Sequence, residues 1–84
     1  QKGGAVFDAN VTAFHEDAEG AIWIATSNGL VRFAGGRFHQ FTTRDGLFHD
    51  NLHQVLEDAD GRLWLGSSGG IFAISRNELN ERAA

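Results

Sequence analysis

Residues 11–33 read VTAFHEDAEGAIWIATSNGLVRF, and residues 52–74 read LHQVLEDADGRLWLGSSGGIFAI. The second stretch matches the first without a gap at an offset of 41 positions, from 11 to 52. The residues that recur are Glu16, Asp17, Ala18, Gly20, Trp23, Ser27 and Gly29, which answer Glu57, Asp58, Ala59, Gly61, Trp64, Ser68 and Gly70. A repeat of about 40–45 residues is typical of a propeller blade or a paired-helix unit. The fold therefore depends on which of these two kinds of unit the repeats form.

The local patterns within each repeat favour strands over helices. Ala21–Thr26 and Arg62–Ser67 contain Ile-Trp-Ile and Leu-Trp-Leu, runs of strand-forming residues too short for helices. Glycine pairs and Asn-Gly between such runs supply the positive φ that two-residue hairpin turns need. The remaining predicted strands are 11–16, 30–33, 37–42, 52–57 and 71–74. We therefore predict an all-β fold of two four-stranded meanders, each forming one blade of a β-propeller.

The C-terminal tail departs from the repeat. Ser75-Arg76-Asn77-Glu78 has the Ser-x-x-Glu form of a helix capping box, which predicts a short helix from about Arg76 to Arg82. The second blade then lacks the outer strand that Arg37–Thr42 gives the first. We divide the chain into a first blade at 5–46, an incomplete second blade at 47–75 and a helical tail at 76–84.

The alternation around each tryptophan predicts sheets that are apolar on both faces. Trp23 and Trp64 point to one side of their strands, and their aliphatic neighbours point to the other. Stacked blades would cover both faces. The six residues expected to pack between blades are Ile22, Trp23, Ile24, Leu63, Trp64 and Leu65.

Two blades bury one mutual face and leave two outer faces bare. These lie on opposite sides of the unit, so we expect head-to-tail contacts between copies of the chain, which close into a ring or propagate as a filament. Propellers have about 4–8 blades, so units of two blades would close as dimers, trimers or tetramers. We favour a homotrimer or homotetramer, with six or eight blades, over an open filament. The propeller is expected to close only through this oligomerisation.

The repeated residues also carry a family resemblance. Glu16-Asp17, Gly20, Ile22-Trp23-Ile24 and Gly29-Leu30, with their second copies and the linker Phe41–Leu47, resemble the two-component regulator propeller repeat from about Ala5 to Ile74. The resemblance implies part of a seven-bladed, ligand-sensing propeller in the periplasmic sensor region of bacterial hybrid histidine kinases, many of which respond to carbohydrate. An engineered propeller fragment is the other source that this pattern allows. Identical two-blade chains cannot build a ring of seven blades.

Composition excludes several classes of function. The net charge is −4 and the seven basic residues are scattered, so we expect no nucleic-acid partner. No apolar run approaches the ~20 residues of a membrane span, so we expect no membrane contact by this segment. The chain has no cysteine, which excludes disulfides and thiolate chemistry.

No metal or cofactor is expected. The acidic turn Asp58-Ala59-Asp60-Gly61 could begin a calcium loop, but no further ligands follow it. We interpret Asp17, Gly20, Asp58 and Gly61 as turn-forming residues. The four histidines (His15, His39, His49 and His53) do not have the grouping that zinc requires.

The sequence predicts a non-enzymatic module, because neither a nucleophile elbow nor a phosphate-binding loop occurs. A ligand would meet the loops at the ring face, where we select Asn28, Arg44, His49 and Asp50. The alternative is a propeller enzyme of the streptogramin lyase type, with a metal site on one face to which only His49 and His53 could contribute.

Overall fold

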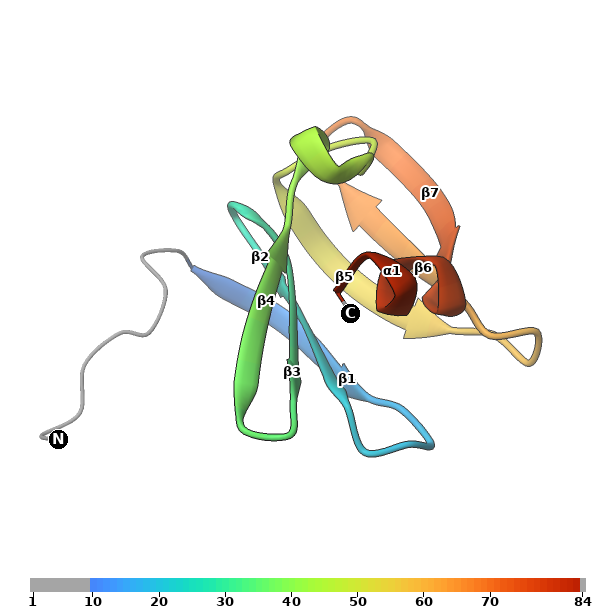
Figure 1. The fold of residues 1–84 in the computed structure, drawn as a ribbon. Helices are drawn as coiled ribbons and strands as arrows, with labels where there is room; N and C mark the ends of the chain where they lie inside the picture. The colour runs from blue at the N-terminus through green and yellow to red at the C-terminus, as the bar shows by residue number, and fades with distance from the viewer. Residues whose placement is uncertain (1–9, 84) are drawn as a thin grey trace, which may run out of the picture.

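The structure, a computed structural model, describes residues 10–83. It contains two antiparallel sheets, a short 3-10 helix between them and a C-terminal α-helix (Figure 1). The elements are β1 (Val11–Glu16), β2 (Ile22–Thr26), β3 (Gly29–Ala34), β4 (Arg37–Phe41), η1 (Thr43–Asp45), β5 (Leu52–Glu57), β6 (Arg62–Ser67), β7 (Gly70–Ser75) and α1 (Arg76–Ala83).

Each sheet is a meander in which every strand pairs with the next along the chain. The first sheet, here called blade 1, has the order β1-β2-β3-β4, and the second, blade 2, has the order β5-β6-β7. The predicted fold class, two blade-like sheets of which the second lacks its outer strand, is confirmed. The boundaries 5–46, 47–75 and 76–84 stay a prediction, and residues 5–9 and 84 lie outside the described residues.

Strand ends differ slightly from the expected ones, for local reasons. β2 begins at Ile22 rather than Ala21, because its pairing with β3 ends where Ile22 lies opposite Phe33, whereas Arg62 in β6 still pairs with Ser75. β4 ends at Phe41 rather than Thr42, because Thr42 caps η1. The turn between β2 and β3 depends on Gly29, whose φ of 104° is accessible to few other residues.

The register of each blade separates two faces around its tryptophan. Trp23 pairs with His15 on β1 and Arg32 on β3. Residues paired across neighbouring strands share a face of the sheet. These three side chains therefore point the same way, and Ile22 and Ile24 point the other way.

The hydrophobic core lies between the two blades. Blade 1 contributes the face that carries its tryptophan, Trp23. Blade 2 contributes the face that does not carry its tryptophan, on which Leu63 and Leu65 lie. The core residues are Trp23, Ala25, Leu30, Phe41, Leu47, Leu52, Val55, Leu63, Leu65 and Leu79. We call this contact between the blades the internal seam.

Helix α1 folds back onto the internal seam and does not extend blade 2 (Figure 1). Leu79 is fully buried in the core, and the Arg82 guanidinium donates to the carbonyl of Asp45 on η1. The Ser75 hydroxyl accepts from the amide of Glu78 at 3.4 Å, as the predicted cap requires. The Glu78 carboxylate pairs with Arg82 at 2.6 Å, so it does not complete the capping box. Within residues 10–83, no helix has the length and apolar character to cross a membrane.

Candidate functional site

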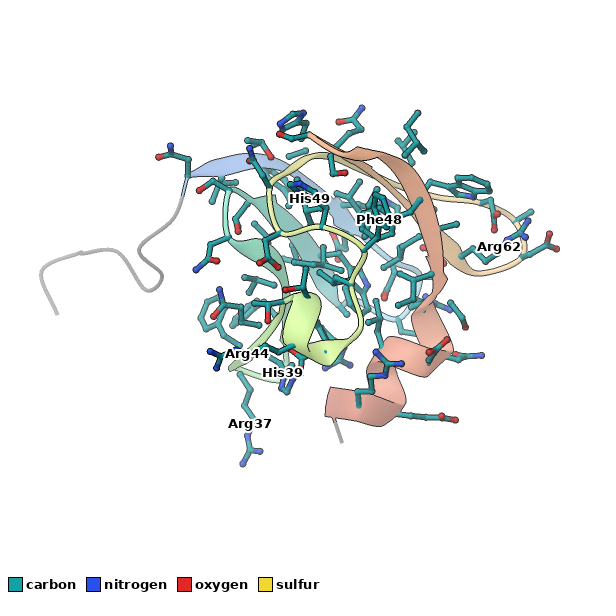
Figure 2. The ribbon with its side chains drawn as sticks, turned by 90° about the horizontal axis from the view of Figure 1, so that it is seen from above. Arg37, His39, Arg44, Phe48, His49 and Arg62 are labelled. Carbon is teal, nitrogen blue, oxygen red and sulfur yellow. The ribbon has the colours of Figure 1, made fainter. Side chains whose placement is uncertain are left out.

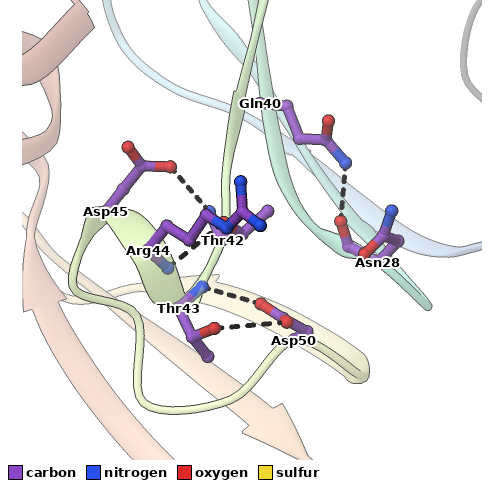
Figure 3. A pocket seen from close by; sticks show the side chains of 7 residues that line it. All are labelled: Asn28, Gln40, Thr42, Thr43, Arg44, Asp45 and Asp50. Atoms are coloured by element: carbon purple, nitrogen blue, oxygen red, sulfur yellow. Dashed lines mark hydrogen bonds between the residues drawn. The ribbon is translucent and has the colours of Figure 1, made fainter.

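A polar pocket opens beside the end of β4, where the β2–β3 turn, η1 and the linker to β5 meet (Figure 3). Its volume is about 460 Å³. The lining side chains are all polar or charged: Asn28, Gln40, Thr42, Thr43, Arg44, Asp45 and Asp50. Three of the four residues selected from the sequence as ligand contacts, Asn28, Arg44 and Asp50, are thus brought together.

The floor of the pocket is η1, which a capping box holds in place. Thr42 is extended, and its hydroxyl accepts from the amide of Arg44 at 3.3 Å. The Asp45 carboxylate accepts from the amide of Thr42 at 3.0 Å, and Gly46 ends the turn at a φ of 101°. Sequence reasoning treated this segment as a plain linker. Its signal was the Thr-x-x-Asp spacing, an acidic variant of the pattern that predicted α1.

Asp50 joins η1 to the β2–β3 turn. Its carboxylate accepts from the amide of Thr43 at 2.8 Å and lies 3.4 Å from the Thr43 hydroxyl. Its backbone carbonyl accepts from the amide of Gly29 at 2.6 Å. Both carboxylate oxygens of Asp50 are therefore engaged, and this residue shapes the pocket from the linker side.

Three of the lining residues, Gln40, Arg44 and Asn28, offer polar groups to a ligand. The Gln40 amide nitrogen donates to the backbone carbonyl of Asn28 at 2.7 Å, and the side-chain oxygen of Gln40 makes no hydrogen bond within the described residues (Figure 3). Within the described part of the chain, the Arg44 guanidinium and the Asn28 side-chain amide make no hydrogen bond or ion pair. Arginine supplies five donors, and the two amide side chains supply donors and acceptors. The arrangement can therefore hydrogen-bond a small polar molecule from opposite sides.

His49, the fourth selected residue, does not line the pocket. Its ring nitrogen Nδ1 accepts from the amide of Asn51 at 3.1 Å, and its ring lies beside that of Phe48 (Figure 2). His53 instead approaches the Ser68 hydroxyl at 3.3 Å. Among residues 10–83, no three histidine, cysteine or acidic side chains come together in a way that could hold a metal ion.

Each blade contains a carboxylate that bonds its tryptophan. Asp17 accepts from the Trp23 indole at 2.8 Å, and Asp58 accepts from the Trp64 indole at 2.7 Å. The other oxygen of each carboxylate accepts two backbone amides of the turn that follows. The turn interpretation did not foresee the indole bond, although the aspartate and the tryptophan recur together six positions apart.

These bonds lower the pKa of both carboxyl groups. For Asp58 the indole of Trp64 is the largest cause, followed by the turn amides and Arg62, and the pKa falls to about 2. For Asp17, burial raises the pKa, but the Trp23 indole, the turn amides and the Arg76 charge outweigh it, so the pKa also lies below its ordinary value. Both carboxylates are therefore ionised at neutral pH, which suits structural acceptors.

Charged groups cross the internal seam at one end. Arg76 Nη1 lies 3.3 Å from the Asp17 carboxylate and 3.5 Å from that of Glu57. Glu57 also contacts His15 Nε2 at 2.9 Å, and the Thr12 hydroxyl donates to the carbonyl of Leu52 at 2.8 Å. Side chains from both blades and from α1 therefore hold the seam together.

The six residues expected to pack between blades divide into two groups. Trp23, Leu63 and Leu65 are buried in the internal seam. Ile22 and Ile24 lie on the outer face of blade 1, and Trp64, 39% exposed, lies on the outer face of blade 2. Successive side chains along β2 and β6 point to opposite faces of their sheets. Only one face of each blade is covered by the other blade of the same chain, so the residues on the other face stay on the outside.

The comparisons with known proteins agree with this architecture. The family model described as the two component regulator propeller matches residues 6–28 and 46–69, the repeat segments that contain Trp23 and Trp64. That model describes a structural repeat not known as catalytic. No curated protein matches the chain significantly. Because the two matched segments cover more than half of the sequence, the chain belongs to the two component regulator propeller family.

Proposed function

We propose that this chain is a non-enzymatic sensing module, which assembles head-to-tail with copies of itself into a propeller ring and binds a small polar ligand in the pocket beside β4. One observation carries the assembly. The face that blade 2 leaves exposed repeats the face that blade 1 buries, and it exposes the large apolar side chains Leu56, Trp64 and Ile71.

The repeat frame allows this comparison residue by residue. His15 and Arg32, which flank Trp23 in the internal seam, correspond to Leu56 and Ala73 beside Trp64. Leu56 and the nearby Ile71 are exposed. A sheet face that meets water normally carries polar side chains, and contiguous exposed apolar residues indicate an interaction surface.

The outer face of blade 1 has the complementary character. Val11 and Phe14 are exposed there, and they correspond to Leu52 and Val55, which are buried in the internal seam. The two outer faces are thus repeats of the two faces that already pack together. A contact between unlike faces of successive copies is heterologous and can close into a ring. A homotrimer or homotetramer places the blade number within the range of known propellers.

The mass of the assembled protein tests this part of the proposal. Native mass spectrometry or light scattering at micromolar concentration should give three or four times the 9.1 kDa of the chain. A single species of 9.1 kDa would contradict the assembly. A broad distribution of masses that increases with protein concentration would indicate an open filament instead of a closed ring.

The ligand site is proposed once per chain. The counterparts of Asn28 and Gln40 are Gly69 and Glu81, so blade 2 does not repeat the pocket. The free donors and acceptors favour a small molecule with several hydrogen-bonding groups, and the family resemblance favours carbohydrate. In a receptor of this family, the module would lie in the extracytoplasmic sensor region.

Amide chemical shifts of isotope-labelled protein, titrated with a panel of mono- and disaccharides, test the ligand site. Binding should move signals of residues 28 and 40–50, and Arg44→Ala should weaken it by about tenfold. Arg37→Ala, an exposed arginine at the far end of β4 (Figure 2), is the matched control. Shifts confined to other residues, or equal losses in both variants, would refute the site.

A further inference from the structure

The internal seam ends in a triad of charges with an arginine at its centre. Arg76 lies between Asp17, which belongs to blade 1, and Glu57, which belongs to blade 2. The Arg76 and Asp17 side chains are largely buried, so their charges need these partners. The triad is therefore a specific link between two stacked blades.

A contact between two copies cannot reuse this arginine at the equivalent position. Shifted by the repeat, Asp17 corresponds to Asp58, and Glu57 corresponds to Glu16 of the next copy. Arg76 corresponds to Gly35, which has no side chain. A copy-to-copy seam built only from equivalents would leave Asp58 and Glu16 near each other without a cation.

Arg62 supplies a cation at this place from a different position. Its Nε lies 3.0 Å from the Asp58 carboxylate, and its guanidinium carbon lies 5.6 Å from the centre of the Trp64 ring (Figure 2 labels Arg62). Its counterpart in blade 1 is Ala21, so the repeat itself does not require an arginine here. The side chain is half exposed and can reach a second carboxylate.

Glu16 is the acidic group that this arginine lacks. It is exposed, pairs in register with Ile22 on the outer face of blade 1, and has no hydrogen bond or ion pair within residues 10–83. Its counterpart Glu57 pairs in register with Leu63 and contacts both His15 and Arg76. Glu16 and Arg62 lie on opposite outer faces, so they can meet only between copies.

We propose that Arg62 bridges Asp58 of its own chain and Glu16 of the next copy, and so fixes the register of the copy-to-copy seam. This inference rests on the proposed head-to-tail assembly. Because His15 is replaced by Leu56 at this seam, Arg62 is the sole counter-charge that the face of blade 2 offers Glu16 among the described residues. The seam is then apolar at its centre, around Trp64, and charged at this one edge.

Two variants, each with one of its outer faces altered, would reduce the proposed ring to a single contact between two chains. Phe14→Glu places a charge on the apolar outer face of blade 1, and Leu56→Glu places a charge on that of blade 2. Each variant alone should be monomeric, and their mixture should form a 1:1 heterodimer in sedimentation velocity, since each retains the face that the other lacks. If no heterodimer forms, the head-to-tail assembly is wrong, and the bridge is wrong with it.

A double-mutant cycle on that heterodimer tests the bridge by itself. Arg62→Ala is placed on the Phe14→Glu chain, and Glu16→Ala is placed on the Leu56→Glu chain. Each should raise Kd about threefold to tenfold, and both together should raise it no more than the larger single change. Arg37→Ala on the Phe14→Glu chain should leave Kd unchanged, and Arg62→Gln replaces Arg62→Ala if the latter alters the circular dichroism. Independent, multiplying effects would overturn the bridge while the assembly itself stands.

Discussion

Trp23 and Trp64 occupy the same position of the repeat and make the same bond to an aspartate, but they meet different surroundings. Trp23 is fully buried, whereas Trp64 is 39% exposed. Cation–π contacts accompany both rings, from Arg32 over Trp23 at 5.8 Å and from Arg62 over Trp64 at 5.6 Å. The comparison teaches that the local structure of a blade follows from its own sequence, and that the burial of its faces depends on the neighbouring blade.

Truncating the two tryptophans should give the largest difference between the blades. On the Phe14→Glu chain, in which the proposed association is blocked, Trp23→Ala should cost about 3–5 kcal/mol, the typical loss for a buried aromatic, and Trp64→Ala about 1 kcal/mol. Urea unfolding followed by circular dichroism measures both. Trp23→Phe, which keeps a ring, gives an intermediate value if Trp23→Ala does not fold. Equal losses in the two blades would mean that the rings are equally buried in solution.

The same comparison explains how far the sequence could predict the structure. The Asp, Gly and Trp positions of the repeat are local signals, and they placed the strands and turns within a residue or two. Ile22, Ile24 and Trp64 lie on outer faces, whereas their repeat counterparts are buried. This difference in burial depends on how many blades lie side by side, which the periodicity of the sequence does not show. Within the pocket, Asn28, Arg44 and Asp50 could be selected because loops of a blade gather at one end. Gln40 was missed because it belongs to a strand, and His49 was selected although its ring accepts from the backbone amide of Asn51 and does not line the pocket.

The glycines that open β3 and β7 give the next largest contrast. A Cβ on Gly29 would lie 2.2 Å from the carbonyl oxygen of Phe41, whereas a Cβ on Gly70 would meet nothing within 4 Å. Both residues have a positive φ, so both substitutions are strained. Gly29→Ala should therefore cost about 2–4 kcal/mol and Gly70→Ala about 1–2 kcal/mol, measured by urea unfolding of the Phe14→Glu chain. A larger loss for Gly70→Ala would contradict the close approach of the β2–β3 turn to β4.

Replacing the two aspartates should give a smaller difference in stability loss between the blades. Asp17→Asn removes an acceptor from a buried indole and a charge from Arg76, and it should cost about 1–3 kcal/mol. Asp58→Asn should cost less, because water can reach the groups that Asp58 bonds. The difference between the two urea midpoints is the test, with Asp60→Asn, an exposed carboxylate of the same turn, as the control. A larger loss at Asp58 than at Asp17 would show that the seam does not bury the Asp17 network.

Acid should weaken both blades slightly, for a reason that the aspartates share. The pKa of Asp58 is about 2 in the folded chain. An unfolded aspartate has a pKa of about 3.9. A carboxyl whose pKa is lower in the folded state stabilises the fold fully above the unfolded pKa, and that contribution is lost as the pH falls through the folded one. The contribution of Asp58 should therefore be complete above about pH 4 and decline toward pH 2, and that of Asp17 should decline in the same direction, because its pKa is also lowered. Urea midpoints of the Phe14→Glu chain between pH 2 and pH 6 should show this decline, and Asp58→Asn should make it shallower without changing its sign. An identical decline with and without Asp58 would mean that the indole and turn amides do not hold this carboxylate in its charged form.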